Sequence, residues 1–131
     1  MKGTILDIKE LKIRARKNHI KITDHPYYQC LSRQNGNIYE NYVNESKHQQ
    51  KKKTGDWHGY NRLVQKIKEE GFIYKKDDTL LIKYKHDDWY VTHGRHRACI
   101  LRYLYGKKIK FVLKKLHNKN HTFYVKNIIL Y

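Results

Sequence analysis

Residues 89–101 read WYVTHGRHRACIL, an extended segment that passes through a glycine into a helical one. Aromatic and β-branched side chains over residues 89–92 favour a strand. After Gly94, apolar side chains recur at helical spacing from Ala98 until Gly106, which is a typical helix terminator. The segment therefore predicts a strand that turns directly into a helix.

The first turn of this expected helix has the chemistry of an anion site. Its leading N–H groups lack partners within the helix, and the helix dipole adds partial positive charge there. Gly94 lets a ligand approach the backbone, Arg95 and Arg97 offer guanidinium forks for phosphate oxygens, and His93 and His96 add further donors. The alternative is that Arg97 pairs with a carboxylate or carbonyl and that Gly94 only turns the chain.

The sequence predicts neither a metal site nor a disulfide framework. His93 and His96 could suggest a metal site, but no third Cys, His or carboxylate stands at ligand spacing, so no metal site is predicted. Cys30 and Cys99 show no CxxC spacing and are expected to be small buried residues. A reducing cytosol is the expected compartment.

The residues just before the junction predict a helix and a hairpin. Asp56 is a candidate N-cap for a helix that ends at Gly71, because the apolar residues between them follow helical spacing. Residues 80–84 and 88–92 read as two strands around a turn at His86 and Asp87.

The outer parts of the chain are less regular. Residues 1–23 predict one or two strands, and Pro26 is expected to mark an exit from regular structure. Residues 34–54 predict a short helix beside a long polar loop. Residues 109–114 alternate like a half-buried strand, and residues 122–131 predict an edge strand. This order predicts an α+β protein, with a small mixed sheet and helices packed on it, in one domain.

Length and charge narrow the classes of protein. The chain has 131 residues and 16.0 kDa, enough for a single domain with one core. It carries 29 Lys and Arg against 12 Asp and Glu, a net charge of +17, which favours nucleic acid, nucleotides, phosphorylated sugars or an anionic membrane surface as partners. The alternative is that the lysines are only a solvated surface, since abundant Lys, Asn, Ile and Tyr are also typical of A+T-rich coding.

Membrane and secretory segments are not expected. No run of about 18 apolar residues is present, so no membrane-spanning segment is predicted. Residues 1–17 contain no apolar core and no small-residue cleavage site, so no secretory signal is predicted either.

Over about 60 residues the order of these elements resembles the N-terminal domain of the ParB/sulfiredoxin superfamily. Its members carry versions of Gly-x-(His/Arg)-Arg at a strand-to-helix junction, after a hairpin and a helix that ends in glycine. Here the motif is Gly94, Arg95, His96 and Arg97. The resemblance implies a single ParB/sulfiredoxin-like domain over residues 1–131, of the stand-alone type, that binds a nucleotide or phosphate through these four residues.

The superfamily includes CTP-hydrolysing partition proteins, ATP-using sulfinic acid reductases and kinases of free serine. The reductases keep a catalytic Cys where this chain has Arg95, so their chemistry is not expected. The partition proteins carry an acidic residue there and a separate helix-turn-helix domain, which nothing after Tyr105 matches. A nucleoside triphosphate with Mg²⁺ is the cofactor that the resemblance leads us to expect.

A phosphotransferase of this type would also need a base or a metal ligand near the acceptor hydroxyl. Glu40 and Glu45 are the candidates, because they stand in a non-periodic region that could fold over the junction. The alternative is that they are solvated acids. Tyr39 and Tyr42 stand three residues apart. Their rings could stack on the base or sugar of a bound nucleotide, or they could pack in the core.

Three functions therefore stay open. The first is a nucleotide- or phosphate-binding domain that acts as an NTP-dependent phosphotransferase or NTPase. The second is a DNA-binding protein or ParB-like nuclease that uses its basic surface. The third is a module that senses a nucleotide without turning it over.

Overall fold

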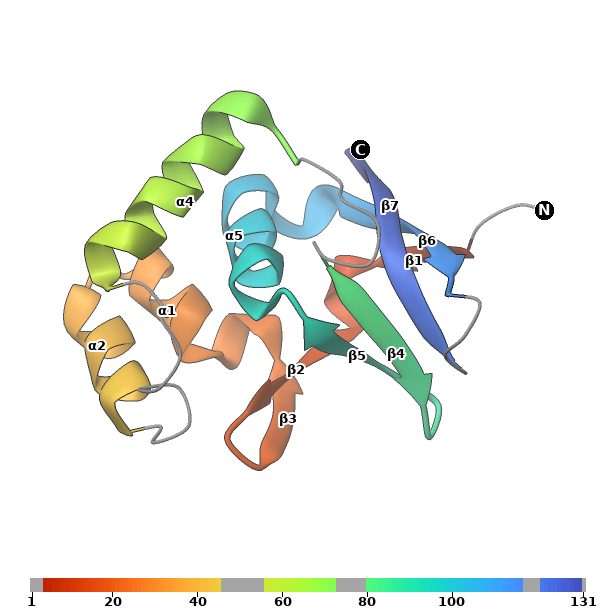
Figure 1. Cartoon of the computed structure of the whole chain (residues 1–131), viewed down its shortest axis with the longest axis horizontal. Coiled ribbons are helices and arrows are strands. Elements are labelled where there is room, and N and C mark those ends of the chain that lie inside the picture. Colours follow the sequence, from red (N-terminus) through yellow and green to blue (C-terminus); the bar gives the residue numbers. More distant parts are fainter. Residues whose placement is uncertain (1–3, 46–55, 73–79, 117–120, 131) are drawn as a thin grey trace.

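The computed structural model describes residues 4–45, 56–72, 80–116 and 121–130. Within them the protein belongs to the α+β class, with four α-helices and a seven-stranded mixed sheet. In Figure 1 the helices lie on one side of the molecule and the sheet on the other. Most of the predicted polar loop, residues 46–55, lies outside the described residues.

The strands are β1 (Thr4–Asp7), β2 (Leu11–Ala15), β3 (Asn18–Lys21), β4 (Leu81–Lys85), β5 (Asp88–His93), β6 (Ile109–Lys115) and β7 (Thr122–Leu130). The α-helices are α1 (Pro26–Ser32), α2 (Gly36–Glu45), α4 (Trp57–Glu70) and α5 (Arg95–Tyr105). Short 3-10 turns are η1 (Ile8–Glu10), η2 (Ile22–Asp24) and η3 (Gly106–Lys108).

The sheet is strongly curled. Its strand order is β1-β6-β7-β4-β5-β2-β3, so β1 and β2 stand five positions apart. In a flat sheet that separation would be about 24 Å. The chain from Asp7 to Leu11, however, can span only about 14 Å. The sheet must therefore bend back on itself, and η1, which joins β1 to β2, also contacts β6.

Helix α5 is the central helix. It contacts β5, β6, α1 and α4, and its residues Ala98 to Leu101 are all fully buried. Four consecutive buried positions cover every side of a helix, so α5 is enclosed by protein in the middle of its length. The buried side chains of the sheet, among them Ile13, Ile82, Val91 and Phe111, complete this core.

Helices α1, α2 and α4 form the outer helical layer. Helix α1 contacts both α2 and α5. At the start of α4, Asp56 caps the helix by accepting from the N–H of Gly59 at 2.8 Å, and Gly71 ends it with φ +79°. Both ends of α4 were predicted from the sequence and are confirmed.

Gly36 allows α2 to approach α4 closely. A Cβ placed on Gly36 would lie 2.6–2.8 Å from ring atoms of Trp57, closer than real carbon contacts. Gly36→Ala should therefore destabilise the protein by about 1–3 kcal/mol through overpacking, measured as the free energy of unfolding in urea. Gly59→Ala, within α4, is the control; an equal loss in both variants would contradict this account of Gly36.

Several other predictions are tested by the fold. The hairpin of β4 and β5 is confirmed, with positive φ at His86 and Asp87 as a tight turn requires. The half-buried strand that begins at Ile109 is confirmed as β6. The N-terminal segment forms three strands, where one or two were expected, because the turn that joins β2 to β3 at Arg16 has no Asn-Gly or Gly signal.

Two predictions were wrong. Pro26 does not mark an exit from regular structure: it is the first residue of α1, where a missing N–H costs nothing because that group has no helical partner. Strand β7 is not an edge strand, since it lies between β6 and β4 and its adjacent residues Tyr124 and Val125 are both buried. Its place at the end of the sequence says nothing about its place in the sheet.

Among the described helices, none combines the length and the apolar character that crossing a bilayer requires.

Candidate functional site

The junction between β5 and α5 has the predicted form. Gly94 stands between the two elements with φ +87° and ψ +35°, in the left-handed region that favours glycine. No side chain of the described residues caps the start of α5, and its first intrahelical bond runs from the N–H of Ala98 to the carbonyl of Gly94 at 2.9 Å. The N–H groups of the first turn thus have no partner within the helix.

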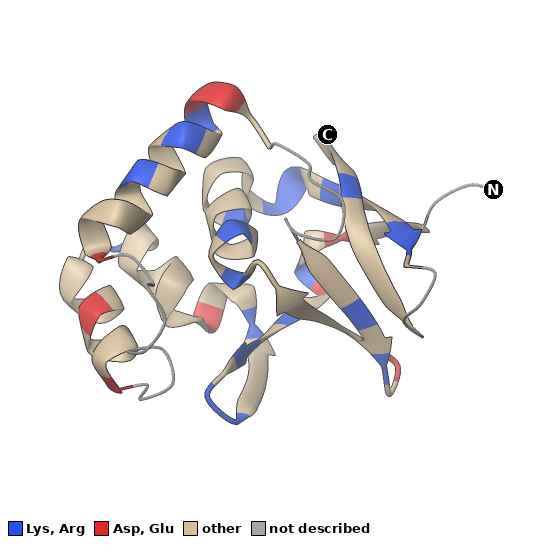
Figure 2. Ribbon diagram, in the orientation of Figure 1, with Lys and Arg blue, Asp and Glu red and all other residues tan. Residues whose placement is uncertain are grey.

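Arginines from the β2–β3 hairpin join this junction. Arg95 Nη1 donates to the carbonyl of Arg14 at 3.3 Å, and Arg14 Nε donates to the carbonyl of Arg16 at 2.6 Å. Arg16 in turn pairs with the carboxylate of Glu45, at the end of α2. We call Arg14, Arg16 and Arg95 the arginine cluster. Among the described residues only Arg16 of the three pairs with a carboxylate, so the corner carries excess positive charge. Figure 2 shows this charge on the β2–β3 hairpin and at the start of α5.

Arg97 lies in the first turn of α5. The residue is only partly buried. Neither an ion pair nor a hydrogen bond joins its guanidinium to any other residue in the described part of the chain. The described residues therefore do not form the alternative arrangement, in which Arg97 pairs with an acidic residue of the protein.

His96 is turned into the protein. Its ring stacks on Tyr27 with centroids 4.0 Å apart, and its Nε2 lies 3.3 Å from the hydroxyl of Tyr39. Burial, and then the positive charges of Arg95 and Arg97, lower the pKa of His96 to about 4. The ring is therefore neutral at pH 7 and packs in the core. Of the groups of His96, only the backbone N–H can donate to an anion at this corner.

His25 lies fully buried behind the corner. Its Nδ1 accepts from the N–H of Tyr27 at 2.9 Å, which caps α1 and leaves the ring proton on Nε2. Nε2 has no hydrogen-bond partner among the described residues. Burial, and then the charge of Arg95, lower the pKa of His25 to about 3, against a smaller opposing contribution from the Arg14 backbone.

The two predicted acids lie in different places. Glu45 reaches the arginine cluster through Arg16. Glu40 instead accepts from the backbone N–H of Trp57 at 2.8 Å, so it satisfies one of the free donors at the start of α4. Residues five apart on a helix point about 140° away from each other, which is why the two carboxylates do not converge. Tyr39 and Tyr42 are both buried and pack in the core.

Arg14 and Arg16 are the residues of this site that sequence reasoning missed. Their signal is the three cations among residues 14–17, at the end of an alternating strand. The pairing of Leu11 to Ile13 with Trp89 to Val91, in a parallel ladder, brings these cations beside Gly94. Parallel neighbours have no short-range signature, so the sequence alone did not place them together.

The two cysteines lie in the core and away from solvent. Cys30 and Cys99 are fully buried free thiols, as predicted, and burial raises the pKa of Cys30 to about 12. The described residues contain no group of three His, Cys, Asp or Glu side chains arranged to hold a metal ion.

Comparison of the chain with protein-family models, curated proteins and solved structures finds no match in any of the three. Assignment to the ParB/sulfiredoxin superfamily therefore stays a prediction from the motif at residues 94–97 and the order of elements around it.

Proposed function

We propose that this protein binds the phosphate groups of a nucleotide, or of a phosphorylated small molecule, at the start of α5. The observation that carries the proposal is Arg97, a guanidinium in the first turn of the helix with no partner among the described residues. A partner-free arginine beside unpaired helix N–H groups is suited to phosphate oxygens, which accept from both.

The arginine cluster supports the same proposal. Arg95 and Arg14 donate to the backbone carbonyls of Arg14 and Arg16, and Glu45 pairs with only one of the three guanidiniums. A bound anion would offset the excess positive charge. Gly94 contributes by having no side chain over the first turn, and His96 contributes its backbone N–H.

Binding of a nucleoside triphosphate is tested by thermal unfolding with ATP, CTP and GTP, each at about 1 mM with and without Mg²⁺. A ligand present at one hundred times its Kd stabilises the fold by about 2.7 kcal/mol, a rise in Tm of several degrees for a domain of this size. We expect at least one nucleotide to give such a rise and Arg97→Ala to abolish it.

Arg62→Ala is the matched control, because Arg62 is an exposed arginine on α4 and its loss changes the net charge equally. It should keep the full shift. If no nucleotide raises Tm in the unaltered protein, or if both variants lose the shift alike, the proposed site at α5 is wrong.

Phosphoryl transfer would be a further step at the same site. Of the two candidate acids, Glu45 is the one joined to the arginine cluster, so we propose it ahead of Glu40 as the group nearest a bound phosphate. Release of nucleoside diphosphate with Mg²⁺, lost in Glu45→Gln while binding persists, would support catalysis. Binding without any turnover would make the protein a nucleotide sensor.

A further inference from the structure

A second cationic surface lies on the face of the sheet opposite the buried side chains of β2. In the ladders, Lys12 is paired with Lys21 and with Tyr90, and Tyr90 is paired with Lys83. Residues directly paired across strands point to the same side of a sheet. These four side chains therefore form one row across β3, β2, β5 and β4, which we call the lysine row.

Arg14 and His19 extend this surface by a second pair. They stand opposite each other on β2 and β3, two residues along from Lys12 and Lys21 and hence on the same side. The ring of His19 reaches that of Tyr90, with centroids 4.3 Å apart and planes tilted by 54°. An aromatic pair thus lies among the cations, and His19 is exposed to solvent.

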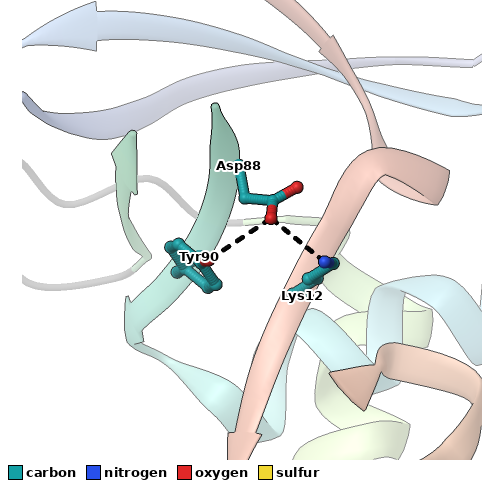
Figure 3. Close-up of polar contacts among 3 residues, drawn as sticks. All are labelled: Lys12, Asp88 and Tyr90. Atoms are coloured by element: carbon teal, nitrogen blue, oxygen red, sulfur yellow. Dashed lines mark hydrogen bonds and ion pairs between the residues drawn. The ribbon is translucent and has the colours of Figure 1, made fainter. Parts of the chain in front are cut away.

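Carboxylates are scarce in the described strands that form this surface. Strands β2, β3, β4 and β5 contain a single acidic residue, Asp88. Its Oδ2 lies 3.1 Å from Lys12 Nζ and 3.4 Å from the hydroxyl of Tyr90, so that both side chains point toward it in Figure 3. Asp88 therefore balances Lys12 and anchors the Tyr90 ring.

The other cations of the surface remain unbalanced. No ion pair joins Lys21, Lys83 or Arg14 to a carboxylate among the residues that the structure describes. Lys21 also stands directly opposite Lys12, an arrangement of like charges that destabilises a sheet. Such a surface is suited to a bound polyanion, which would supply the missing negative charge.

We propose that this surface binds single-stranded nucleic acid. Cations spaced along strands with an aromatic ring among them match the two requirements of such binding, phosphate neutralisation and base stacking. Unpaired bases would stack on the pair of Tyr90 and His19, while Lys21 and Lys83 would contact phosphates. Paired bases in a duplex present no free face to these rings, so the aromatic pair favours single strands.

The test is fluorescence anisotropy with a labelled dT15 oligonucleotide and a 15-base-pair duplex, over a series of salt concentrations. Each phosphate contact on a single strand contributes about 0.7 to the slope of log K against log salt. The double variant Lys21→Glu/Lys83→Glu should therefore lower that slope by about 1.4. Lys66→Glu/Lys68→Glu, two exposed lysines of α4, makes the same change in net charge elsewhere and should leave most of the slope in place.

Stacking is tested at Tyr90. Tyr90→Leu should weaken dT15 binding by about 5- to 100-fold, whereas Tyr90→Phe keeps the ring and should bind nearly as well as the unaltered protein. Circular dichroism spectra and melting curves check that each variant is folded. The proposal is overturned if both double variants lose the same affinity, if Tyr90→Leu binds as well as Tyr90→Phe, or if the duplex binds as tightly as dT15. Nucleotide binding at α5 can fail without affecting any of these results.

Discussion

Lowering the pH from 7.5 to 5 should remove about 4 kcal/mol from the free energy of unfolding. His25 and His96 hold pKa values of about 3 and about 4 in the folded protein, because burial and neighbouring arginines disfavour their charged forms. In the unfolded chain both would titrate near 6.5. Between these values the unfolded state binds more protons than the folded state, so stability falls as the pH falls below 6.5.

The size of the effect follows from 1.36 kcal/mol for each unit of pKa difference. At pH 5 each histidine contributes about 2 kcal/mol of destabilisation, against a total stability of about 5–15 kcal/mol for a typical domain. A charge on His25 also disfavours a charge on His96, so protonating one ring does not make it easier to protonate the other. The loss should level off only as the pH approaches 4 and then 3.

Urea unfolding at pH 7.5, 6.5, 5.5 and 5.0 measures this dependence. His96→Phe keeps a ring against Tyr27 but cannot be protonated, so it should retain only about half of the pH dependence, about 2 kcal/mol. His58→Gln removes an exposed histidine of α4 and should leave the dependence unchanged. A difference of less than about 1 kcal/mol between pH 7.5 and 5.0 in the unaltered protein would show that these rings are not held neutral.

Tyr27→Ala should cost about 3–5 kcal/mol of stability at pH 7.5. Tyr27 is fully buried and its ring contacts five others, at centroid distances from 4.0 to 6.0 Å. The five are His25, Tyr39, Tyr42, Tyr60 and His96. Removing the central ring would leave a cavity between these side chains, and the dispersion attraction and aromatic pairing that it gives each of them would disappear.

The loss is measured as the free energy of unfolding in urea, with Tyr103→Ala as the matched control. Tyr103 lies on α5 but is 36% exposed, and among the described residues its hydroxyl bonds only to the side chain of Gln34, at 3.1 Å. Its removal should cost less than about 1 kcal/mol. Tyr27→Leu fills part of the cavity, so its loss of stability should lie between those of Tyr27→Ala and Tyr103→Ala. This variant keeps the test informative if Tyr27→Ala does not fold. Equal losses for Tyr27→Ala and Tyr103→Ala would contradict the central role of this ring.

Local signals accounted for the elements that the sequence predicted correctly. Asp56 and Gly71 mark the ends of α4, and the passage from strand to helix at Gly94 follows from a change of period around a glycine. Such features depend on neighbours a few residues away. The α+β class follows from their order.

Long-range pairing accounts for what was missed. The contacts of β2 with β5, and of β1 with β6, join segments about 80 and 100 residues apart, as the registers of Ile13 with Val91 and Leu6 with Phe111 show. The inward turn of His96 was equally hidden. It precedes buried Cys99 and Ile100 by three and four residues, but Arg97 precedes buried Ile100 and Leu101 in the same way. Only the tertiary neighbours decide which ring or guanidinium enters the core.

The pairing of β1 with β6 also governs when the chain can finish folding on the ribosome. Thr4 pairs with Leu113, so β1 cannot form its ladder until 113 − 4 = 109 further residues have been synthesised. At usual rates of synthesis this wait is about 5–20 s. During that interval the N-terminal strand exposes both hydrogen-bonding edges, and Leu6 has no core to enter. A nascent chain should therefore stay sensitive to proteases and dependent on chaperones until β6 has emerged.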